Sequence, residues 1–352
     1  MHELLDVKTV TPSRPPHPIS TNKQVTIRPP APVIPKQTPM KVHTPPPVAQ
    51  QTPVVTNTPV TPVAPREINK MNSDSFFVIG TGHDVCQDYV AHHNNGVKSY
   101  VVLADGCSGS KDSDVGARVL VKTHELYIPR MGIMDFNEFA RRSPDIYSKV
   151  IEEAESNAKA LELDAMALDA TLLSIISNKT GEFMVTCYGD GVVALGRHDG
   201  VIEVYSVSYR DGYPNYLSYQ LSPERKARFD EKTSNFREMT YELIDENDTL
   251  KQVYRSGAIF DTYLGTKKKY CWVAVISDGV QSFVQKNITE TSVTTEPVPS
   301  HEVIREMFAF KNFNGTFVKR RVKRFLELCK ERGWTHYDDL SVGVVYLGGE
   351  NE

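Results

Sequence analysis

The distribution of proline separates this chain into two parts with different capacities to fold. Of its 22 prolines, 16 lie within residues 1–65. Proline fixes φ and has no backbone N–H, so a segment this rich in it continues neither a helix nor the centre of a sheet. We therefore expect a disordered or polyproline-II tail over residues 1–72, followed by one folded domain over residues 73–352.

The tail allows two interpretations. Spacings of the PxxP type, such as Pro32 to Pro35 and Pro59 to Pro62, can occupy the aromatic-lined groove of a partner protein. Such spacings also arise by chance in any proline-rich stretch, so we favour a spacer over a docking arm. The repeated Thr-Pro dipeptides give only a weak indication of regulation by phosphorylation.

Composition argues against several classes of protein. The chain has 352 residues, 24% charged and 40% hydrophobic, and its formal net charge of −4 lacks the basic excess of a nucleic-acid binder. Its five cysteines form no CxxC pair, which favours a reducing compartment over a zinc ribbon or a disulfide framework. No apolar run reaches the ~18 residues of a membrane span. We expect a cytoplasmic monomer that binds neither nucleic acid nor membrane.

The folded part mixes strand and helix patterns. Runs of β-branched and aromatic residues predict strands, and apolar residues at helical spacing predict helices. Because proline disfavours helix in the preceding residue, we expect an interruption near Ser143-Pro144. The order of elements predicts an α+β fold with antiparallel sheets. Predicted strands cover 73–80, 99–104, 170–177, 181–190, 191–207 (with a turn at 197–200), 270–280 and 340–348, and predicted helices lie after 113 and within 136–163, 301–309 and 317–331.

Acidic residues recur where the predicted strands end. Asp105, Asp190 and Asp278 each precede a glycine there, Asp338 immediately precedes the last strand, and Asp88 follows the first. One Asp-Gly pair is an ordinary turn signal, but several carboxylates at such positions can converge on a hard cation such as Mg²⁺ or Mn²⁺. The chain has no compact HExxH or CxxC alternative and no phosphate-binding GxxxxGK[ST] loop.

Five motifs around these aspartates resemble a known family in their order and spacing. They are HDVCQDYV, LADGCSGS, CYGDGVVAL, VISDGVQSF and HYDDLSVGVVYL, and they resemble the signature motifs of the metal-dependent type 2C protein phosphatases over residues 74–348. DGCSGS and DGYPNYLSYQL resemble the divergent bacterial and phage branch. The resemblance implies a four-layer sandwich of two antiparallel β-sheets flanked by α-helices, with two Mg²⁺ or Mn²⁺ ions at one end and loops from 208–270 beside them.

The same resemblance assigns metal-binding roles to individual residues. Asp105 matches the aspartate that bridges the two metals, and Gly106 matches the glycine whose carbonyl is a ligand. Asp278 and Asp338 match two further carboxylate ligands. Asp190 matches an aspartate associated with a third, weaker metal in some members, although it can equally be a hairpin residue.

Other positions carry catalytic roles or depart from the family. Asp88 matches an acidic residue that holds a metal or its water, and His83 stands in place of an arginine that clamps the substrate phosphate. Either a protonated His83 or another cation such as Arg118 can substitute for that arginine. Cys107 replaces a histidine proposed as general acid, and we interpret it as a small residue packed in a turn. Asp339 replaces the usual asparagine.

These assignments imply a phosphatase that acts on phosphorylated proteins. Two divalent ions can activate one water and neutralise the phosphoryl oxygens, so a phosphoserine or phosphothreonine ester is hydrolysed without a covalent intermediate. One alternative is a catalytically silent phosphatase fold that binds phosphoprotein as a scaffold, because His83 and Cys107 depart from the pattern. Another is a hydrolase of small phosphorylated molecules.

Overall fold

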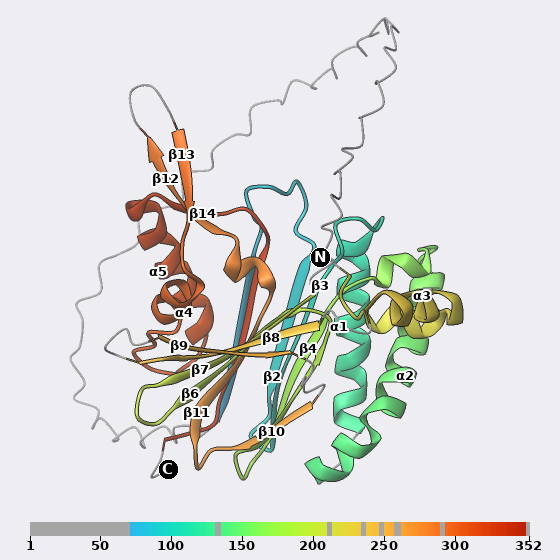
Figure 1. Cartoon of the computed structure of the whole chain (residues 1–352). Helices are drawn as coiled ribbons and strands as arrows, with labels where there is room; N and C mark the ends of the chain where they lie inside the picture. Colours follow the sequence, from blue (N-terminus) through green and yellow to red (C-terminus); the bar gives the residue numbers. More distant parts are fainter. Residues whose placement is uncertain are drawn as a thin grey trace, which may run out of the picture. The chain divides into compact units, whose positions relative to one another are not determined.

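Two antiparallel sheets pack face to face in the computed structural model (Figure 1), which describes residues 71–130, 135–209, 213–233, 237–245, 250–256, 262–288 and 293–349. In spatial order, one sheet contains β1 (Asn72–Val78), β15 (Leu340–Tyr346), β11 (Tyr270–Ile276), β6 (Gly191–Arg197), β7 (Ile202–Tyr209), β8 (Arg237–Ile244) and β9 (Leu250–Ser256). The other contains β10 (Thr262–Thr266), β5 (Glu182–Tyr188), β4 (Leu172–Asn178), β3 (Lys98–Asp105) and β2 (Asp88–Asn94).

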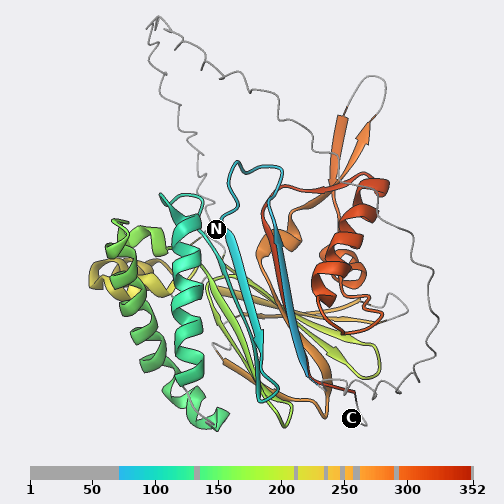
Figure 2. The ribbon, with the colours of Figure 1, turned by 180° about the vertical axis from the view of Figure 1, so that it is seen from behind.

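Helices cover the outer face of each sheet, as the two opposite views in Figures 1 and 2 show. The five-stranded sheet is covered by α1 (Ser113–Arg130) and α2 (Phe136–Ala160), and the seven-stranded sheet by α4 (Ser300–Met307) and α5 (Phe317–Arg332). The predicted α+β sandwich of two antiparallel sheets flanked by helices is therefore confirmed. Smaller elements are α3 (Pro223–Thr233), a sheet of β13 (Val293–Pro297), β12 (Phe283–Ile288) and β14 (Trp334–His336), and 3-10 turns η1 (Ala165–Leu168), η2 (Leu217–Leu221) and η3 (Asp278–Gln281).

Alternating side chains of the central strands pack into different hydrophobic layers. In β3, Val101 and Leu103 lie between the two sheets, whereas Val102 and Ala104 face α1 and α2. The same alternation in β11 places Val275 between the sheets and points its neighbours toward α4 and α5. Because both faces of these strands are covered, their sequences are continuous apolar runs rather than alternating ones.

The predicted interruption at Pro144 is wrong, because α2 continues through this residue. Proline has no N–H, so the carbonyl oxygen of Ala140 loses its usual helical donor. The hydroxyl of Ser143 donates to that oxygen at 2.9 Å and replaces the missing bond. A local side-chain hydrogen bond thus allows the helix to continue.

The expectations for the 208–270 segment and for the N-terminal tail have different outcomes. The segment 208–270, expected to form loops, contains η2, α3, β8, β9 and β10, so that expectation is wrong for most of its length. Residues 1–70 of the predicted tail lie outside the described residues, and β1 begins at Asn72. No helix in the described ranges is long and apolar enough to cross a membrane.

His124 on α1 gives the fold a testable pH dependence. Its side chain is fully buried, its Nε2 lies 3.1 Å from the Tyr147 hydroxyl, and burial lowers its pKa to about 3. Between that value and the ordinary 6.5, the unfolded chain takes up a proton that the folded chain refuses, so stability falls as the pH falls. We expect this residue to lower the free energy of unfolding by about 2 kcal/mol between pH 7 and pH 5.

Urea unfolding at both pH values measures this effect. The variant His124→Phe keeps an aromatic ring but cannot titrate, so its loss of stability on acidification should be smaller than that of the wild type by this amount. Equal losses in the two proteins would show that His124 is protonated in the folded state.

Candidate functional site

The aspartates singled out in the sequence lie at one end of the sandwich. Strand register pairs Asp88 at the start of β2 with Asp105 at the end of β3. Asp278 follows β11, Asp338 precedes β15, and Asp190 precedes β6, and these three strands are neighbours in the other sheet. Because neighbouring antiparallel strands end and begin at the same edge, residues far apart in sequence meet there.

Four of these carboxylates, those of Asp88, Asp105, Asp190 and Asp278, have raised pKa values, in part because of the charges of neighbouring carboxylates. The pKa of Asp105 lies well above its ordinary value. The main cause is the surrounding protein, although the residue is partly exposed, and the charges of Asp88 and Asp278 add to the effect. Burial also raises the pKa of Asp278, with a further contribution from Asp338. Burial, followed by Asp278, raises the pKa of Asp190 to about 7. This mutual destabilisation of negative charge is relieved by a proton or a cation.

Unpartnered oxygens support a cation at this position. Asp88 Oδ2 accepts a 2.6 Å hydrogen bond from the Ser341 hydroxyl, but its Oδ1 is buried without a partner among the described residues, as is Oδ1 of Asp278. Buried carboxylate oxygens without donors are costly, and they are the ligands that Mg²⁺ and Mn²⁺ prefer. The donor set therefore fits the divalent ions that the sequence implies.

The carboxylates are neighbours, but they do not already have the arrangement of a metal-binding site. Within the ranges that the structure describes, no three His, Cys, Asp or Glu side chains are arranged to hold a metal ion. The electrostatic coupling of Asp105 with Asp278 and Asp338 nevertheless places them in one cluster.

Asp339 anchors the loop that joins β1 to β2. It is buried, and its two oxygens accept backbone hydrogen bonds from Gly80 at 2.7 Å and Gln87 at 2.6 Å. Nδ1 of His83 lies 3.0 Å from Asp339 Oδ2, although its N–H is not aligned for a hydrogen bond, and Nε2 lies 3.6 Å from Asp338 Oδ1. Interaction with Asp339 raises the pKa of His83 against the opposing effect of burial. His83 is therefore held on two carboxylates, with a quarter of its side chain exposed.

The glycines after two of the aspartates permit close backbone contacts. A Cβ on Gly106 would lie 2.6 Å from the carbonyl oxygen of Ser113, at the start of α1. A Cβ on Gly279 would collide with the carbonyl oxygen of Asp339. The Asp-Gly pairs thus allow the acidic strand ends to approach their neighbours, beyond simply forming turns.

Tyr216, which the sequence analysis did not single out, lies beside the cluster. It is buried just before η2, and its pKa is raised by burial and then by nearby Cys107, Asp190 and Asp105. Its hydroxyl therefore stays protonated. Tyr216 belongs to the 208–270 segment that the family resemblance places beside the ions, but no pattern in that segment singles out this tyrosine.

The turn after Asp105 is tied to the same region. The backbone N–H of Cys107 donates to the Asp169 carbonyl oxygen at 2.7 Å, and the Asp169 carboxylate accepts from Ser218 and Arg225, each at 2.6 Å. Cys107 is thus a turn residue beside Tyr216, in agreement with its interpretation from sequence. Arg118, the other proposed clamp, has its guanidinium 5.7 Å from the ring centroid of Tyr89.

The chain matches a family model and several solved structures. The family model for protein phosphatase 2C matches residues 80–327. A bacterial serine phosphatase structure is 10% identical, covering 79% of this chain and 98% of its own with a TM-score of 0.47. The S. agalactiae serine/threonine phosphatase is 14% identical, covering 78% and 99% with a TM-score of 0.46. RsbX in complex with magnesium is also 14% identical, covering 78% and 94% with a TM-score of 0.39. No curated protein sequence matches the chain.

Proposed function

This chain belongs to the protein phosphatase 2C family, and we propose that it is a metal-dependent phosphatase that hydrolyses phosphoserine and phosphothreonine esters of proteins. The observation that carries this proposal is the cluster of coupled carboxylates at one end of the sandwich, with unpartnered oxygens on Asp88 and Asp278. A scaffold that only binds phosphoprotein has no need for such a costly arrangement.

We assign the ions to Asp105, the carbonyl of Gly106, Asp278 and Asp338, with Asp190 as a ligand of a third, weaker ion. Bound Mg²⁺ or Mn²⁺ supplies Lewis acidity that activates water and neutralises the phosphoryl oxygens. The donor chemistry of the cluster and its raised pKa values support this assignment. We propose that the site binds two ions and that a third binds at Asp190.

The protein side chains position the reactants and hold protons. Asp88, fixed by Ser341, presents its free Oδ1 as an acceptor, and burial raises its pKa to about 7. His83 lies against Asp338 and Asp339, and its interaction with Asp339 raises its pKa, which favours the protonated form that can attract phosphate. Tyr216 keeps its proton and can donate a hydrogen bond beside Asp105.

The proposal is tested by hydrolysis of p-nitrophenyl phosphate and of a phosphothreonine peptide, each with and without Mn²⁺ or Mg²⁺. We expect metal-dependent release of phosphate from both substrates. Binding of the peptide without turnover would support the scaffold, and turnover of the small ester alone would support a small-molecule hydrolase. Either outcome would contradict the proposed protein phosphatase.

Asp190→Ala separates the proposed third ion from the other two. Asp190 is coupled to Asp278 and Asp338 but is not one of the principal ligands assigned above. We expect the variant to keep the Mn²⁺-dependent rise in melting temperature while its kcat falls about tenfold or more. Thermal unfolding and steady-state kinetics measure the two effects. A parallel loss of metal binding and stability would instead make Asp190 a principal ligand or a turn residue.

None of the five cysteines, which all lie in the described ranges, forms a disulfide, and we propose a reducing, cytoplasmic location. The spacer role of residues 1–70 and the monomeric state remain predictions, which deletion of the tail and light scattering can test.

A further inference from the structure

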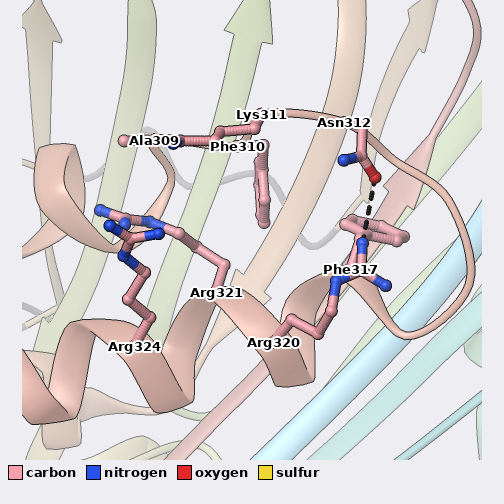
Figure 3. Close-up of a pocket in the computed structure, with 8 residues that line it drawn as sticks. All are labelled: Ala309, Phe310, Lys311, Asn312, Phe317, Arg320, Arg321 and Arg324. Carbon is pink, nitrogen blue, oxygen red and sulfur yellow. Dashed lines mark hydrogen bonds between the residues drawn. The ribbon is translucent and has the colours of Figure 1, made fainter.

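A basic pocket lies between α5 and the segment that joins it to α4. It has a volume of about 210 Å³, and Figure 3 shows its lining residues. The lining includes four cationic side chains and no carboxylate. This volume is below the roughly 300–1,000 Å³ of pockets that enclose whole organic ligands, so it suits a small anionic group. The cationic residues are Lys311, Arg320, Arg321 and Arg324.

The positive charges of the pocket are only partly neutralised. Arg321 contacts Glu306, at 3.5 Å from Oε2, but Glu306 also pairs with Arg332 at 2.8 Å. Arg320 donates to the amide oxygen of Asn312 at 3.0 Å, which adds no negative charge. Within the part of the chain that the structure describes, Lys311 and Arg324 have no acidic partner.

Arg321 is also in an unfavourable environment. Its side chain is 13% exposed, and its Nε is buried without a hydrogen-bond partner in the described structure. Figure 3 shows its guanidinium next to that of Arg324. Burial lowers the pKa of Arg321, and the charge of Arg324 lowers it further against the opposing effect of Glu306. An anion between the two groups would relieve this repulsion.

The position of the cations along α5 also favours binding of an anion. The first half of the helix carries basic residues from Lys319 to Arg324, and its first turn contains no acidic residue. Cations near a helix N-terminus oppose the helix dipole. The carboxylate of Asp74 on β1 accepts a 3.0 Å hydrogen bond from the Lys319 N–H, and this single negative charge offsets only part of the five basic side chains.

The pocket is separate from the aspartate cluster. The loop before α5 is bound to the start of β1, where Asn72 donates to the Phe313 carbonyl oxygen at 2.7 Å. The other end of β1, at Val78, pairs with Leu340, next to the aspartates. β1 extends for seven residues, about 20 Å, between these two ends, so the loop before α5 and the aspartates lie at opposite ends of this strand.

We propose that the pocket of Phe310, Lys311, Asn312, Arg320, Arg321 and Arg324 binds a phosphate group, carried by a phosphorylated protein side chain or present as free phosphate. Guanidinium groups recognise phosphate with charge-assisted, bidentate hydrogen bonds. This site is independent of the proposed catalytic activity, because it shares no residue with the aspartate cluster.

Tryptophan fluorescence can report on this pocket directly. The chain has two tryptophans, and Trp272 packs edge-to-face on Phe310 with ring centroids 6.0 Å apart. In the full-length variant Trp334→Phe, Trp272 is therefore the sole reporter. A chelator prevents metal-dependent turnover during titration. The probes are inorganic phosphate, a phosphothreonine peptide, the same peptide with threonine, and the same peptide with glutamate.

We expect a saturable change in Trp272 emission with phosphate and with the phosphopeptide. Arg324→Gln, at an exposed position, should raise both dissociation constants about tenfold or more, whereas Lys330→Gln, an equal charge change on the same helix outside the pocket, should leave them unchanged. Tighter binding of the phosphopeptide than of phosphate would identify a protein ligand, and response to phosphate alone would identify the free ion. No response to either, equal affinity in Arg324→Gln, or equal binding of the glutamate peptide would overturn the proposal.

Discussion

Asp278→Asn is expected to lower metal-dependent hydrolysis by about a hundredfold or more and to leave the metal-free protein as stable as the wild type or more stable. Burial and the charge of Asp338 raise the pKa of Asp278 in the folded protein. A carboxylate with a raised folded pKa destabilises the fold at any pH above its unfolded pKa. Removal of this charge should therefore stabilise the metal-free protein at neutral pH, and the gain should vanish in acid.

The same substitution should remove most of the stabilisation by metal. A ligand that binds only the folded state raises the melting temperature, and loss of a ligand carboxylate weakens that binding. Asp145→Asn, which removes an exposed carboxylate on α2, is the matched control and should behave as the wild type. Thermal unfolding with and without Mn²⁺, together with phosphopeptide turnover, measures both effects. An active variant with unchanged metal stabilisation would contradict the assigned role of Asp278.

Asp339→Asn is expected to destabilise the protein by about 2–4 kcal/mol. We expect this loss even though Asp339 matches a position where the resembled family usually has asparagine. Both oxygens of the buried Asp339 accept backbone N–H groups, from Gly80 and Gln87. An amide has only one oxygen, so its NH₂ group must face one of these donors. The substitution also removes the negative charge that holds His83 at 3.0 Å.

A double-mutant cycle separates the two contributions. In a His83→Ala background, Asp339→Asn should cost less, because the interaction with the histidine is already absent. The loss of stability that remains in this background measures the unfavourable contact between the asparagine NH₂ group and a backbone N–H of Gly80 or Gln87. Urea unfolding in the presence of a chelator supplies all four free energies. A loss below about 0.5 kcal/mol in the wild-type background would show that the loop rearranges to accept the amide.

The sequence predicts the candidate site well where a short pattern, such as an Asp-Gly pair after an apolar strand, leads to one local structure. Asp105 and Asp278 end buried strands, and the glycine after each is required by a close backbone approach, so these positions carry a readable signal. The apolar runs of the central strands likewise predict a sheet covered on both faces. Their meeting at one edge follows from strand order, which only the family resemblance supplies.

Other features depend on contacts that no local pattern encodes. α2 passes Pro144 because the neighbouring Ser143 hydroxyl replaces the missing backbone donor. Tyr216 reaches the aspartates through the fold of a polar stretch, and its side chain is placed by tertiary packing. The basic residues of α5 look like the solvated side of a helix until the structure places Arg321 against Arg324 in a pocket.

Anomalous diffraction from crystals grown with Mn²⁺ tests the assigned metal site directly. We expect two strong anomalous peaks at the end of the sandwich, in coordination contact with the carboxylates of Asp105, Asp278 and Asp338. A weaker third peak at Asp190 is expected at higher Mn²⁺ concentration. Peaks elsewhere, or no peak among these three carboxylates at saturating Mn²⁺, would contradict the assignment of the site and the hydrolytic mechanism proposed for it.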